Sequence, residues 1–261
     1  MEMSGEEEVY RVGGITDMST VDWYGCLSMV VFWAGCNFRC PYCQNSALIP
    51  FDAGESVSLN FIRERIENAI NPVETIEAAV FTGGEPLLQP DRVIQIARLF
   101  KEYGMKVMLD TNGSIYRSFN KIIETGLVDR VALDVKAPLN PGDYAIFCGP
   151  LITGQQAVSS IKSSLQLCAE KGVPLEIRTT VAPGISDNPN FIKRIACSIK
   201  DYDAVYYLQQ FDNHGEVLDL QLKESEPPSR EGMVELAREA IEAGLRNVYI
   251  KTRRNGLEKI G

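Results

Sequence analysis

The chain has 261 residues, 45% of them hydrophobic, which is enough for one substantial core in a single domain, with two small domains as the alternative. Its net charge of −9 argues against sequence-independent binding to nucleic acid, which relies on excess Lys and Arg. The acidic start from Met1 to Glu8 is unlike a secretory signal, and the apolar run Leu27–Trp33 is too short to span a bilayer. We therefore expect a soluble, cytoplasmic protein without a membrane partner.

Short apolar runs and segments with helical spacing alternate along the chain. The runs expected to be strands are Leu27–Trp33, Ala78–Phe81, Lys106–Asp110, Arg130–Asp134, Pro174–Thr180, Ala204–Leu208 and Asn247–Ile250. The segments expected to be helices are Leu59–Ile70, Pro90–Tyr103, Ile115–Glu124, Gly154–Lys171, Pro189–Ile199 and Ser229–Ala243. This alternation is typical of parallel strands joined by crossover helices. It predicts an α/β fold, a partial (β/α)6 TIM-like barrel, with an open doubly wound sheet as the alternative.

The two ends of the chain are expected to lie outside this repeating pattern. Within one domain spanning residues 1–261, residues 1–20 form an N-terminal extension and about residues 215–261 a C-terminal extension. The pair Pro227-Pro228 makes a local break, and a basic cluster runs from Lys251 to Arg254. A solvated tail is the expected state of the C-terminal extension.

Polar motifs follow the predicted strands. A cysteine cluster follows the first strand, Thr82 to Glu85 the second, Asp110 to Gly113 the third, Asp134 to Lys136 the fourth, and Gln209-Gln210 the sixth, while Arg178 lies late in the fifth. In α/β barrels, reactive groups gather at the carboxyl ends of the strands. The sequence therefore predicts one active-site rim.

Three of the seven cysteines, Cys36, Cys40 and Cys43, lie within eight residues of one another on the loop after the first strand. An odd number of cysteines without a signal peptide does not indicate a disulfide framework, and a reducing compartment fits better. Three thiolates this close can hold one metal centre. An iron–sulfur cluster normally takes four cysteines, so three would leave one iron open to a substrate or cofactor.

Two other interpretations of the triplet are open. A structural zinc knuckle would need a fourth cysteine or a histidine, and the only histidine is His214, far along the chain. Three core cysteines without a metal are the other interpretation, but such tight clustering is rare in a reduced protein. The remaining cysteines are expected to be buried small residues, with Cys26 as the exception because it lies near the triplet.

The Cys-x3-Cys-x2-Cys spacing, with the aromatic Tyr42 before the last cysteine, resembles the radical S-adenosylmethionine (SAM) superfamily. The resemblance implies a [4Fe-4S] cluster on Cys36, Cys40 and Cys43, with SAM chelating the open iron through its amino and carboxylate groups. It also implies that Tyr42 packs on the adenine side. Reductive cleavage of SAM would then give methionine and a 5′-deoxyadenosyl radical, so that the cofactor carries the difficult chemistry.

Further motifs support a SAM site. Gly83, Gly84 and Glu85 match the superfamily's glycine–glycine–glutamate motif. The resemblance implies that this motif binds the SAM amino group, and its glycines would allow the ligand to approach the backbone closely. Taken alone, a Gly-Gly-Glu segment is more often an ordinary turn. Lys136 is expected to pair with Asp134 or with the SAM carboxylate. Arg178 lies between the apolar Ile177 and the pair Thr179-Thr180, and we expect it to point inward. A buried arginine needs an anionic partner: SAM, or else Asp134 or Glu85.

The resemblance extends to the glycyl-radical-enzyme activases, such as those of pyruvate formate-lyase and of anaerobic ribonucleoside-triphosphate reductase. It covers roughly residues 15 to 215, and its most specific segments are Ser19 to Gly25, Val30 to Cys36 and Cys43 to Asn45. The resemblance implies abstraction of a glycine Cα hydrogen from a partner glycyl radical enzyme, with reduced flavodoxin or ferredoxin as the electron donor.

Carried over residue by residue, the activase resemblance assigns further roles. Asp22 would sit near the target glycine, and Asn45 would contact SAM together with Lys136 and Arg178. A monovalent cation beside the SAM carboxylate would be held by Asp110, Thr111 and Asp134.

The chain departs from the activases at three places. Gln44 stands where they often carry histidine, Trp23-Tyr24-Gly25 where they carry Gly-Pro-Gly, and Gln209-Gln210-Phe211 where the longer members have a Pro-Tyr-His-like segment. Two alternative functions therefore stay open. One is a radical SAM enzyme that modifies a small molecule, RNA or another protein site, and the other is a non-catalytic, zinc-stabilised binding protein.

Overall fold

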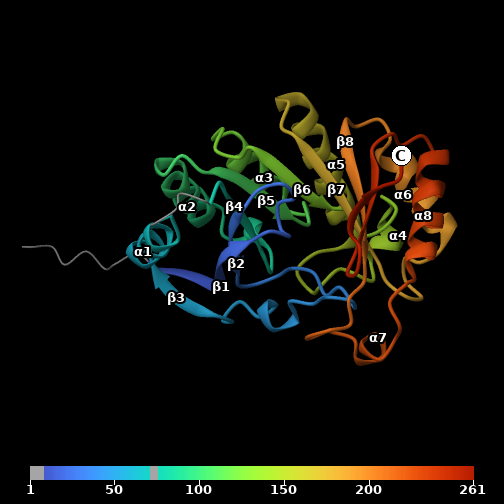
Figure 1. The fold of residues 1–261 in the computed structure, drawn as a ribbon, viewed down its shortest axis with the longest axis horizontal. Coiled ribbons are helices and arrows are strands. Elements are labelled where there is room, and N and C mark those ends of the chain that lie inside the picture. The colour runs from blue at the N-terminus through green and yellow to red at the C-terminus, as the bar shows by residue number, and fades with distance from the viewer. Residues whose placement is uncertain (1–8, 71–75) are drawn as a thin grey trace, which may run out of the picture.

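A single mixed sheet with helices packed on one face forms the protein (Figure 1). The computed structural model describes residues 9–70 and 76–261, and within them ten strands join in the order β10-β9-β8-β7-β6-β5-β4-β2-β1-β3. The seven central strands run parallel to one another: β2 (Ser28–Trp33), β4 (Ala78–Gly83), β5 (Lys106–Thr111), β6 (Arg130–Asp134), β7 (Leu175–Val181), β8 (Ala204–Gln210) and β9 (Val248–Thr252). The predicted α/β fold, a partial barrel of parallel strands, is confirmed.

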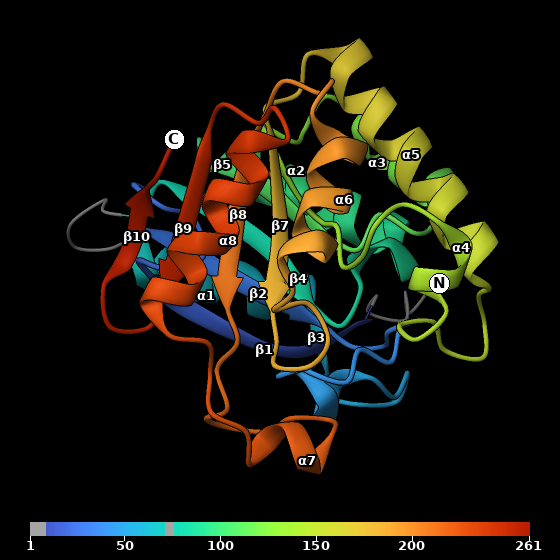
Figure 2. The same ribbon diagram turned by 90° about the vertical axis from the view of Figure 1, so that its right-hand side faces the viewer.

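Crossover helices connect these strands and cover the outer face of the sheet (Figure 2). They are α1 (Leu59–Ile70), α2 (Pro90–Glu102), α3 (Tyr116–Ile123), α5 (Gly154–Lys171), α6 (Pro189–Ile199) and α8 (Arg230–Glu242). Local sequence explains their ends. Thr153 and Gln156 form a reciprocal capping box at the start of α5, and Gly172 ends the helix in the left-handed conformation, at φ 64°. The boundaries therefore match the predicted ones to within a residue.

Antiparallel strands extend the sheet at both edges. They are β1 (Val9–Ser19), β3 (Glu55–Ser58) and β10 (Gly256–Lys259). The sequence did not predict β1, because Gly13 and Gly14 interrupt its apolar run. A Cβ on Gly13 would lie 2.4 Å from the Leu48 side chain, so the glycine admits close packing there. Of the predicted N-terminal extension, residues 1–8 lie outside the described residues.

Four short elements complete the described part of the chain, all in connections between the larger ones. They are the 3-10 turns η1 (Ser46–Leu48) and η2 (Pro86–Leu88) and the single-turn helices α4 (Pro141–Tyr144) and α7 (Leu220–Lys223). Helix α7 projects from the edge of the molecule in both views (Figures 1 and 2). Within the described residues, no helix is both long and apolar enough to cross a membrane.

The expectation of a solvated C-terminal tail is wrong. β9 pairs in parallel with β8, and α8 packs against α6. Val248 and Ile250 are fully buried, and the last residue, Gly261, exchanges backbone hydrogen bonds with Val248. The C-terminal segment is part of the core because its strand buries alternate apolar side chains against the helix layer.

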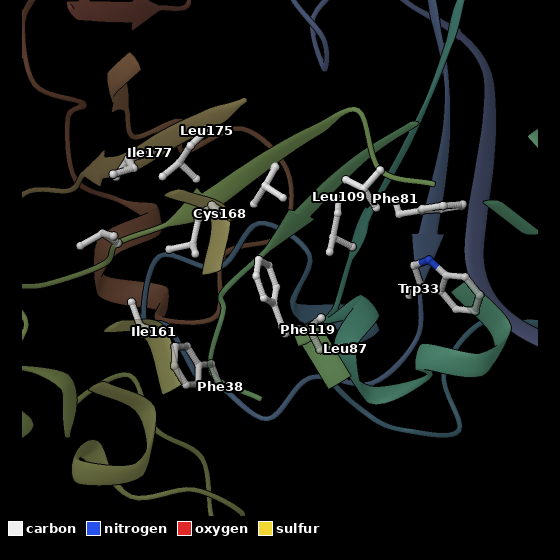
Figure 3. Packing of buried hydrophobic residues seen from close by; sticks show 14 of the residues in the cluster. Trp33, Phe38, Phe81, Leu87, Leu109, Phe119, Ile161, Cys168, Leu175 and Ile177 are labelled. Atoms are coloured by element: carbon white, nitrogen blue, oxygen red, sulfur yellow. The ribbon is translucent and has the colours of Figure 1, made fainter. Parts of the chain in front are cut away.

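The main core lies between the sheet and the helices (Figure 3). Three aromatic rings pack in a row there. The ring centroid of Phe81 lies 6.1 Å from that of Trp33 and 5.9 Å from that of Phe100. Cys168 is buried in this core, but Cys197 is exposed, so the expectation that it is buried is wrong.

A second, smaller core lies on the inner face of the sheet. Val30, Val80, Met108 and Ala132 alternate with the outward-facing residues of their strands, and Trp23 packs against them from the loop between β1 and β2. Farther along the same strands the inward positions become polar. This change from apolar to polar places the functional groups at the carboxyl ends of the strands.

Candidate active site

A cavity of about 470 Å³ lies at the carboxyl ends of the parallel strands. Its size suits a ligand of small-molecule or cofactor dimensions. All the site residues predicted from the sequence line it: Asp22, Cys36, Cys40, Tyr42, Cys43, Asn45, Gly83, Gly84, Glu85, Asp110, Thr111, Asp134, Lys136 and Arg178. The structure thus brings them to one place, whereas their individual roles stay predictions.

The three cysteines lie on one loop after β2, and backbone hydrogen bonds from several segments hold this loop. Its start is fixed by bonds from Cys36 N to Ile49 O at 3.1 Å and from Arg39 N to Phe147 O at 2.8 Å. Its end accepts bonds from the segment before α7, including Leu218 N to Cys43 O at 3.2 Å. These backbone bonds tie the cysteine loop to three other segments of the chain and satisfy its buried polar groups.

Burial keeps the cysteines protonated in the free chain. It raises the pKa of Cys36 and of Cys40 to about 12, and it raises the pKa of Cys43 as well. Metal binding therefore has to displace protons from these thiols. Two neighbours favour the thiolates. Phe38 N donates to Cys36 Sγ at 3.4 Å, and the positive charge of Lys136 lowers the pKa of Cys40 against the effect of burial.

The donor set fits an iron–sulfur cluster with one open iron. Among the described residues that line the cavity, the cysteine and histidine ligands are these three thiols alone. Across residues 9–70 and 76–261, no three His, Cys, Asp or Glu side chains converge closely enough to share one metal ion. The thiol arrangement is compatible with a cluster, in which each thiolate binds a separate iron.

Tyr42 contributes a buried hydroxyl beside the cysteines. The residue is 5% exposed, its ring centroid lies 5.8 Å from that of Phe147, and its hydroxyl has no hydrogen-bond partner among the described residues. Burial raises the pKa of Tyr42 well above its usual value, so the hydroxyl keeps its proton. An unpaired buried hydroxyl is costly, so a ligand in the cavity would stabilise this side chain.

The glycine pair at the end of β4 packs directly on the segment that leads into the cysteine loop. Gly83 has φ 108°, and a Cβ there would lie 2.4 Å from Trp33 N; a Cβ on Gly84 would lie 2.0 Å from Gly35 O. Gly84 N donates to Trp33 O at 2.8 Å, and the Asn45 side-chain amide donates to Gly83 O at 3.2 Å. The glycines are therefore needed for contact between the two loops, in addition to their place on the cavity.

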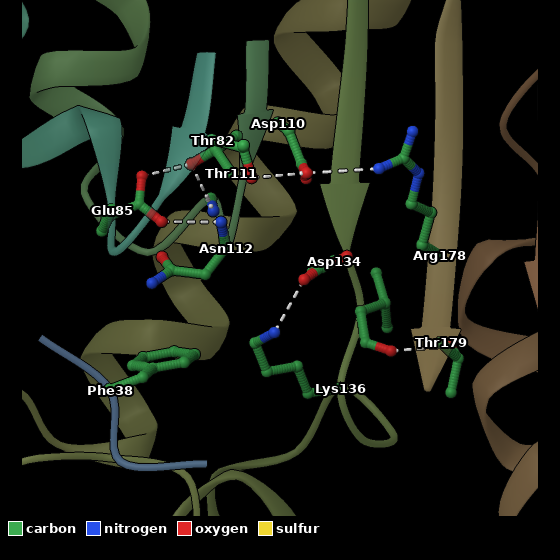
Figure 4. Close-up of polar contacts among 12 residues, drawn as sticks. Phe38, Thr82, Glu85, Asp110, Thr111, Asn112, Asp134, Lys136, Arg178 and Thr179 are labelled. Atoms are coloured by element: carbon green, nitrogen blue, oxygen red, sulfur yellow. Dashed lines mark hydrogen bonds and ion pairs between the residues drawn. The ribbon is translucent and has the colours of Figure 1, made fainter. Parts of the chain in front are cut away.

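Glu85 is a buried bridge between two elements (Figure 4). Its Oε1 accepts from Leu87 N at 3.0 Å and from Thr111 Oγ1 at 2.6 Å, and its Oε2 accepts from Asn112 N at 2.8 Å. Burial outweighs these donors and raises the pKa of Glu85 to about 7. This carboxyl thus caps η2 and holds the end of β5.

Arg178 has acidic partners other than the protein carboxylates that the sequence suggested. Glu85 and Asp134 are wrong as its direct partners. Glu176 Oε1 lies 2.6 Å from Arg178 Nε. Asp110 Oδ2 lies 3.2 Å from Arg178 Nη1 (Figure 4). The sequence order hid these partners, because Glu176 is two residues away on the same strand face and Asp110 is two strands away. Although burial disfavours its charge, Asp110 and Glu176 raise the pKa of Arg178 above its usual range.

The expected ion pair of Asp134 and Lys136 is confirmed, with Lys136 Nζ 2.8 Å from Asp134 Oδ2 (Figure 4). Burial disfavours the ammonium charge, but Asp134 raises the pKa of Lys136 well above its usual value. The cavity therefore presents a permanent cation beside the cysteine loop. Asp22 also lines the cavity, where Ser19 Oγ donates to its carboxylate and Arg178 Nη2 donates to its backbone oxygen at 3.3 Å.

The sequence prediction missed several residues of the cavity wall. The clearest are Lys251, Thr252 and Arg253, at the end of β9. Lys251 Nζ donates to Val21 O at 2.8 Å, which ties the loop that carries Asp22 to the last parallel strand. The tendency of reactive groups to gather at the carboxyl ends of strands could have found them, because they directly follow a predicted strand. The segment was instead interpreted as a tail.

Comparison with known proteins agrees with this geometry. The model of the radical SAM superfamily matches residues 30–195. A protein of Methanocaldococcus jannaschii named as a glycyl-radical enzyme activating enzyme is 34% identical over 248 residues, which cover 92% of this chain and 95% of that protein. The pyruvate formate-lyase-activating enzyme of Clostridium pasteurianum is 29% identical over 205 residues, covering 78% and 82%.

Solved structures share the fold at low sequence identity. A radical SAM methyltransferase from Sphaerobacter thermophilus superposes with a TM-score of 0.71 at 13% identity, over 89% of this chain and 68% of that one. At this identity the likeness concerns the fold alone. It is in keeping with an open sheet of parallel strands whose carboxyl ends surround the cavity.

Proposed function

The chain belongs to the radical SAM superfamily, and on that premise we propose that it activates a partner glycyl radical enzyme by abstracting a hydrogen atom from a glycine Cα. One observation carries the chemistry: three thiols of a single loop face a cavity that also holds the cations Lys136 and Arg178. The similarity to named activating enzymes over 92% of the chain supports the choice of target. The partner is of the pyruvate formate-lyase or anaerobic ribonucleotide reductase kind.

Superfamily membership implies a [4Fe-4S] cluster and SAM as the working groups. Cys36, Cys40 and Cys43 would hold the cluster. When bound, these groups supply the electron and the cleavage that yields methionine and a 5′-deoxyadenosyl radical. The chain's own residues hold the reactants in position, which is how a protein accelerates a reaction whose difficult step belongs to a cofactor.

In this proposal the cavity binds SAM by charge and by packing. The cations Lys136 and Arg178 would attract its carboxylate, and the backbone at Gly83 and Gly84, with Glu85, would face its amino group. Tyr42 and Asn45 would lie on the adenine side. A monovalent cation at Asp110, Thr111 and Asp134 would have to compete with the ion pairs that both aspartates already make.

The target glycine would enter on the side of Asp22. We place the reaction in the cytoplasm, with reduced flavodoxin or ferredoxin as the electron donor. All seven cysteines are free thiols, which supports a reducing compartment.

The test is anaerobic reconstitution with iron and sulfide, followed by an assay for 5′-deoxyadenosine. The reconstituted chain is then mixed with a glycyl radical enzyme, and the glycyl signal is sought by electron paramagnetic resonance. We expect SAM cleavage and a glycyl signal that requires both proteins. A colourless, zinc-loaded chain that never cleaves SAM under reduction would exclude enzymatic use of the cluster.

A second candidate is a radical SAM enzyme that modifies a small molecule, RNA or another protein site. The departures Gln44 and Gln209 to Phe211 favour it, because these residues line the same cavity where a substrate would lie. SAM cleavage without a glycyl signal on any candidate partner would support this second function over the first.

A further inference from the structure

We infer that Glu176, Arg130 and Trp23 form an anchor that fixes the loop of residues 20–26 beside the cavity, so that Glu176 is a positioning residue for Asp22. The inference rests on the proposed function, because the position of Asp22 matters only if a radical reaches a substrate there. It also accounts for a departure of this chain, which carries Trp23-Tyr24 where the activases carry Gly-Pro.

Glu176 holds two arginines with its two carboxylate oxygens. Oε1 lies 2.6 Å from Arg178 Nε, and Oε2 lies 3.4 Å from Arg130 Nη1. Glu176 is 7% exposed and Arg178 8% exposed, so water screens their interaction little. Without the carboxylate, two cations would face each other in a partly dry site.

Both arginines contact the loop of residues 20–26. The Arg130 guanidinium carbon lies 5.4 Å from the centroid of the Trp23 ring, within the range of a cation–π interaction. Arg178 Nη2 donates to the backbone oxygen of Asp22 at 3.3 Å. Two consecutive residues of the loop are thus tied to one carboxylate through separate arginines.

Trp23 is the apolar part of the anchor. It is 5% exposed and packs on Val30, Val80 and Met108 of the inner core. Its neighbours Val21 and Tyr24 are 62% and 67% exposed, so the outer parts of the loop have little packing of their own. The inward Trp23 side chain and the two arginines therefore hold the loop from its inner side, in addition to the bonds that Ser19 Oγ donates to the Asp22 carboxylate and Lys251 Nζ donates to Val21 O.

An anchor of this kind affects the transfer of the radical more than its formation. Neither Arg130 nor Trp23 lines the cavity, whereas Asp22 does. Loosening the loop should leave cluster assembly and SAM cleavage in place and misplace the substrate relative to the radical. A misplacement of about 1 Å is enough to cost a large factor in rate.

The first experiment follows Trp23 by fluorescence in reconstituted full-length protein. The chain has two tryptophans, and Trp33→Phe leaves Trp23 as the only one; the Trp33 indole N–H has no partner among the described residues, so no hydrogen bond is lost. In this background, Arg130→Met and Glu176→Gln should shift Trp23 emission to the red and increase its quenching by acrylamide. Glu258→Gln, which breaks the exposed pair of Glu258 with Arg230, is the matched control and should change neither.

The second experiment measures the glycyl radical formed per 5′-deoxyadenosine released. For Arg130→Met we expect this ratio to fall about tenfold while SAM cleavage stays within about twofold of the parent. A merely structural role would lower both products together and leave the ratio unchanged, and that result, like unshifted Trp23 emission in Glu176→Gln, would overturn the inference. If the parent protein forms no glycyl radical, the proposed function fails, and the fluorescence shift alone then decides whether the anchor exists.

Discussion

The two sides of the cavity are built in different ways. On the cysteine side, one short loop carries the thiols, and backbone hydrogen bonds to neighbouring loops hold it. On the other side, single residues from β5 to β9 meet through charged side chains. Arg178 on β7 contacts Glu176 on the same strand and reaches past β6 to Asp110 on β5. The difference teaches that a metal-binding loop can be specified by residues close in sequence, whereas a charged binding surface requires the sheet to form first.

Replacement of a cluster ligand should have the largest effect. Cys40→Ala removes one of three thiolates, so we expect it to abolish both cluster assembly and SAM cleavage. Iron and sulfide content and 5′-deoxyadenosine yield are the measurements. Cys197→Ala, at an exposed cysteine, should retain both. Retained cleavage in the Cys40 variant would mean that the ligands are assigned wrongly.

On the far side, Arg178→Met should destabilise the fold as well as weaken SAM binding. It leaves Glu176 and Asp110 without their main cation in a buried site, which costs about 3–5 kcal/mol. Urea unfolding measures the free energy, and equilibrium dialysis measures SAM binding. Arg230→Met, which breaks an exposed pair with Glu258, should leave both nearly unchanged. Equal losses in the two variants would remove the distinction between buried and exposed pairs.

Glu85 links the loop after β4 to the end of β5 through its hydrogen bonds. Its raised pKa predicts that the stability of the fold depends on pH. Its pKa is about 7 in the folded chain, above the ordinary 4.5. Between these values the folded chain holds a proton that the unfolded chain has released, so the free energy of unfolding falls as the pH rises. The shift corresponds to about 3 kcal/mol of lost stability by neutral pH.

Urea unfolding of the metal-free chain from pH 4.5 to 7.5 tests this sign. Glu85→Gln should make the profile shallower, because it removes one titrating carboxyl while keeping one acceptor oxygen. Part of the slope should remain, since burial also raises the pKa of Asp110. The raised pKa would be contradicted if the free energy of unfolding of the parent rose from pH 4.5 to 7.5 and that of the Glu85 variant did not.

Contact between the two loops on the cysteine side predicts the smallest effect. Gly84→Ala places a Cβ 2.0 Å from Gly35 O, so the backbones must separate, at a cost of about 1–3 kcal/mol and with a lower cluster content. Gly14→Ala is the control, since nothing lies within 4 Å of the added carbon. Thermal unfolding and iron analysis measure the difference, and equal behaviour of both variants would show that the close approach is unimportant.

Local patterns predicted most of the fold and the cysteine side of the site. The bounds of α1, α5, α6 and β6 follow directly from periodicity, caps and glycines, because these signals act within a few residues. The edge strand β1 escaped, since paired glycines obscure its alternation. The C-terminal strand β9 was predicted as an element, but its place in the sheet was not.

The sequence by itself determined that three thiols would lie together on one loop and that polar groups would follow parallel strands. Spacing along the loop and the strand–helix alternation are local, and they need no knowledge of the rest of the molecule. Only the tertiary structure decided that Arg178 pairs with Glu176 and Asp110, and that Trp23 lies against Arg130. Such pairings depend on strand order, register and inward direction, which are set when the whole sheet packs and not by any one segment.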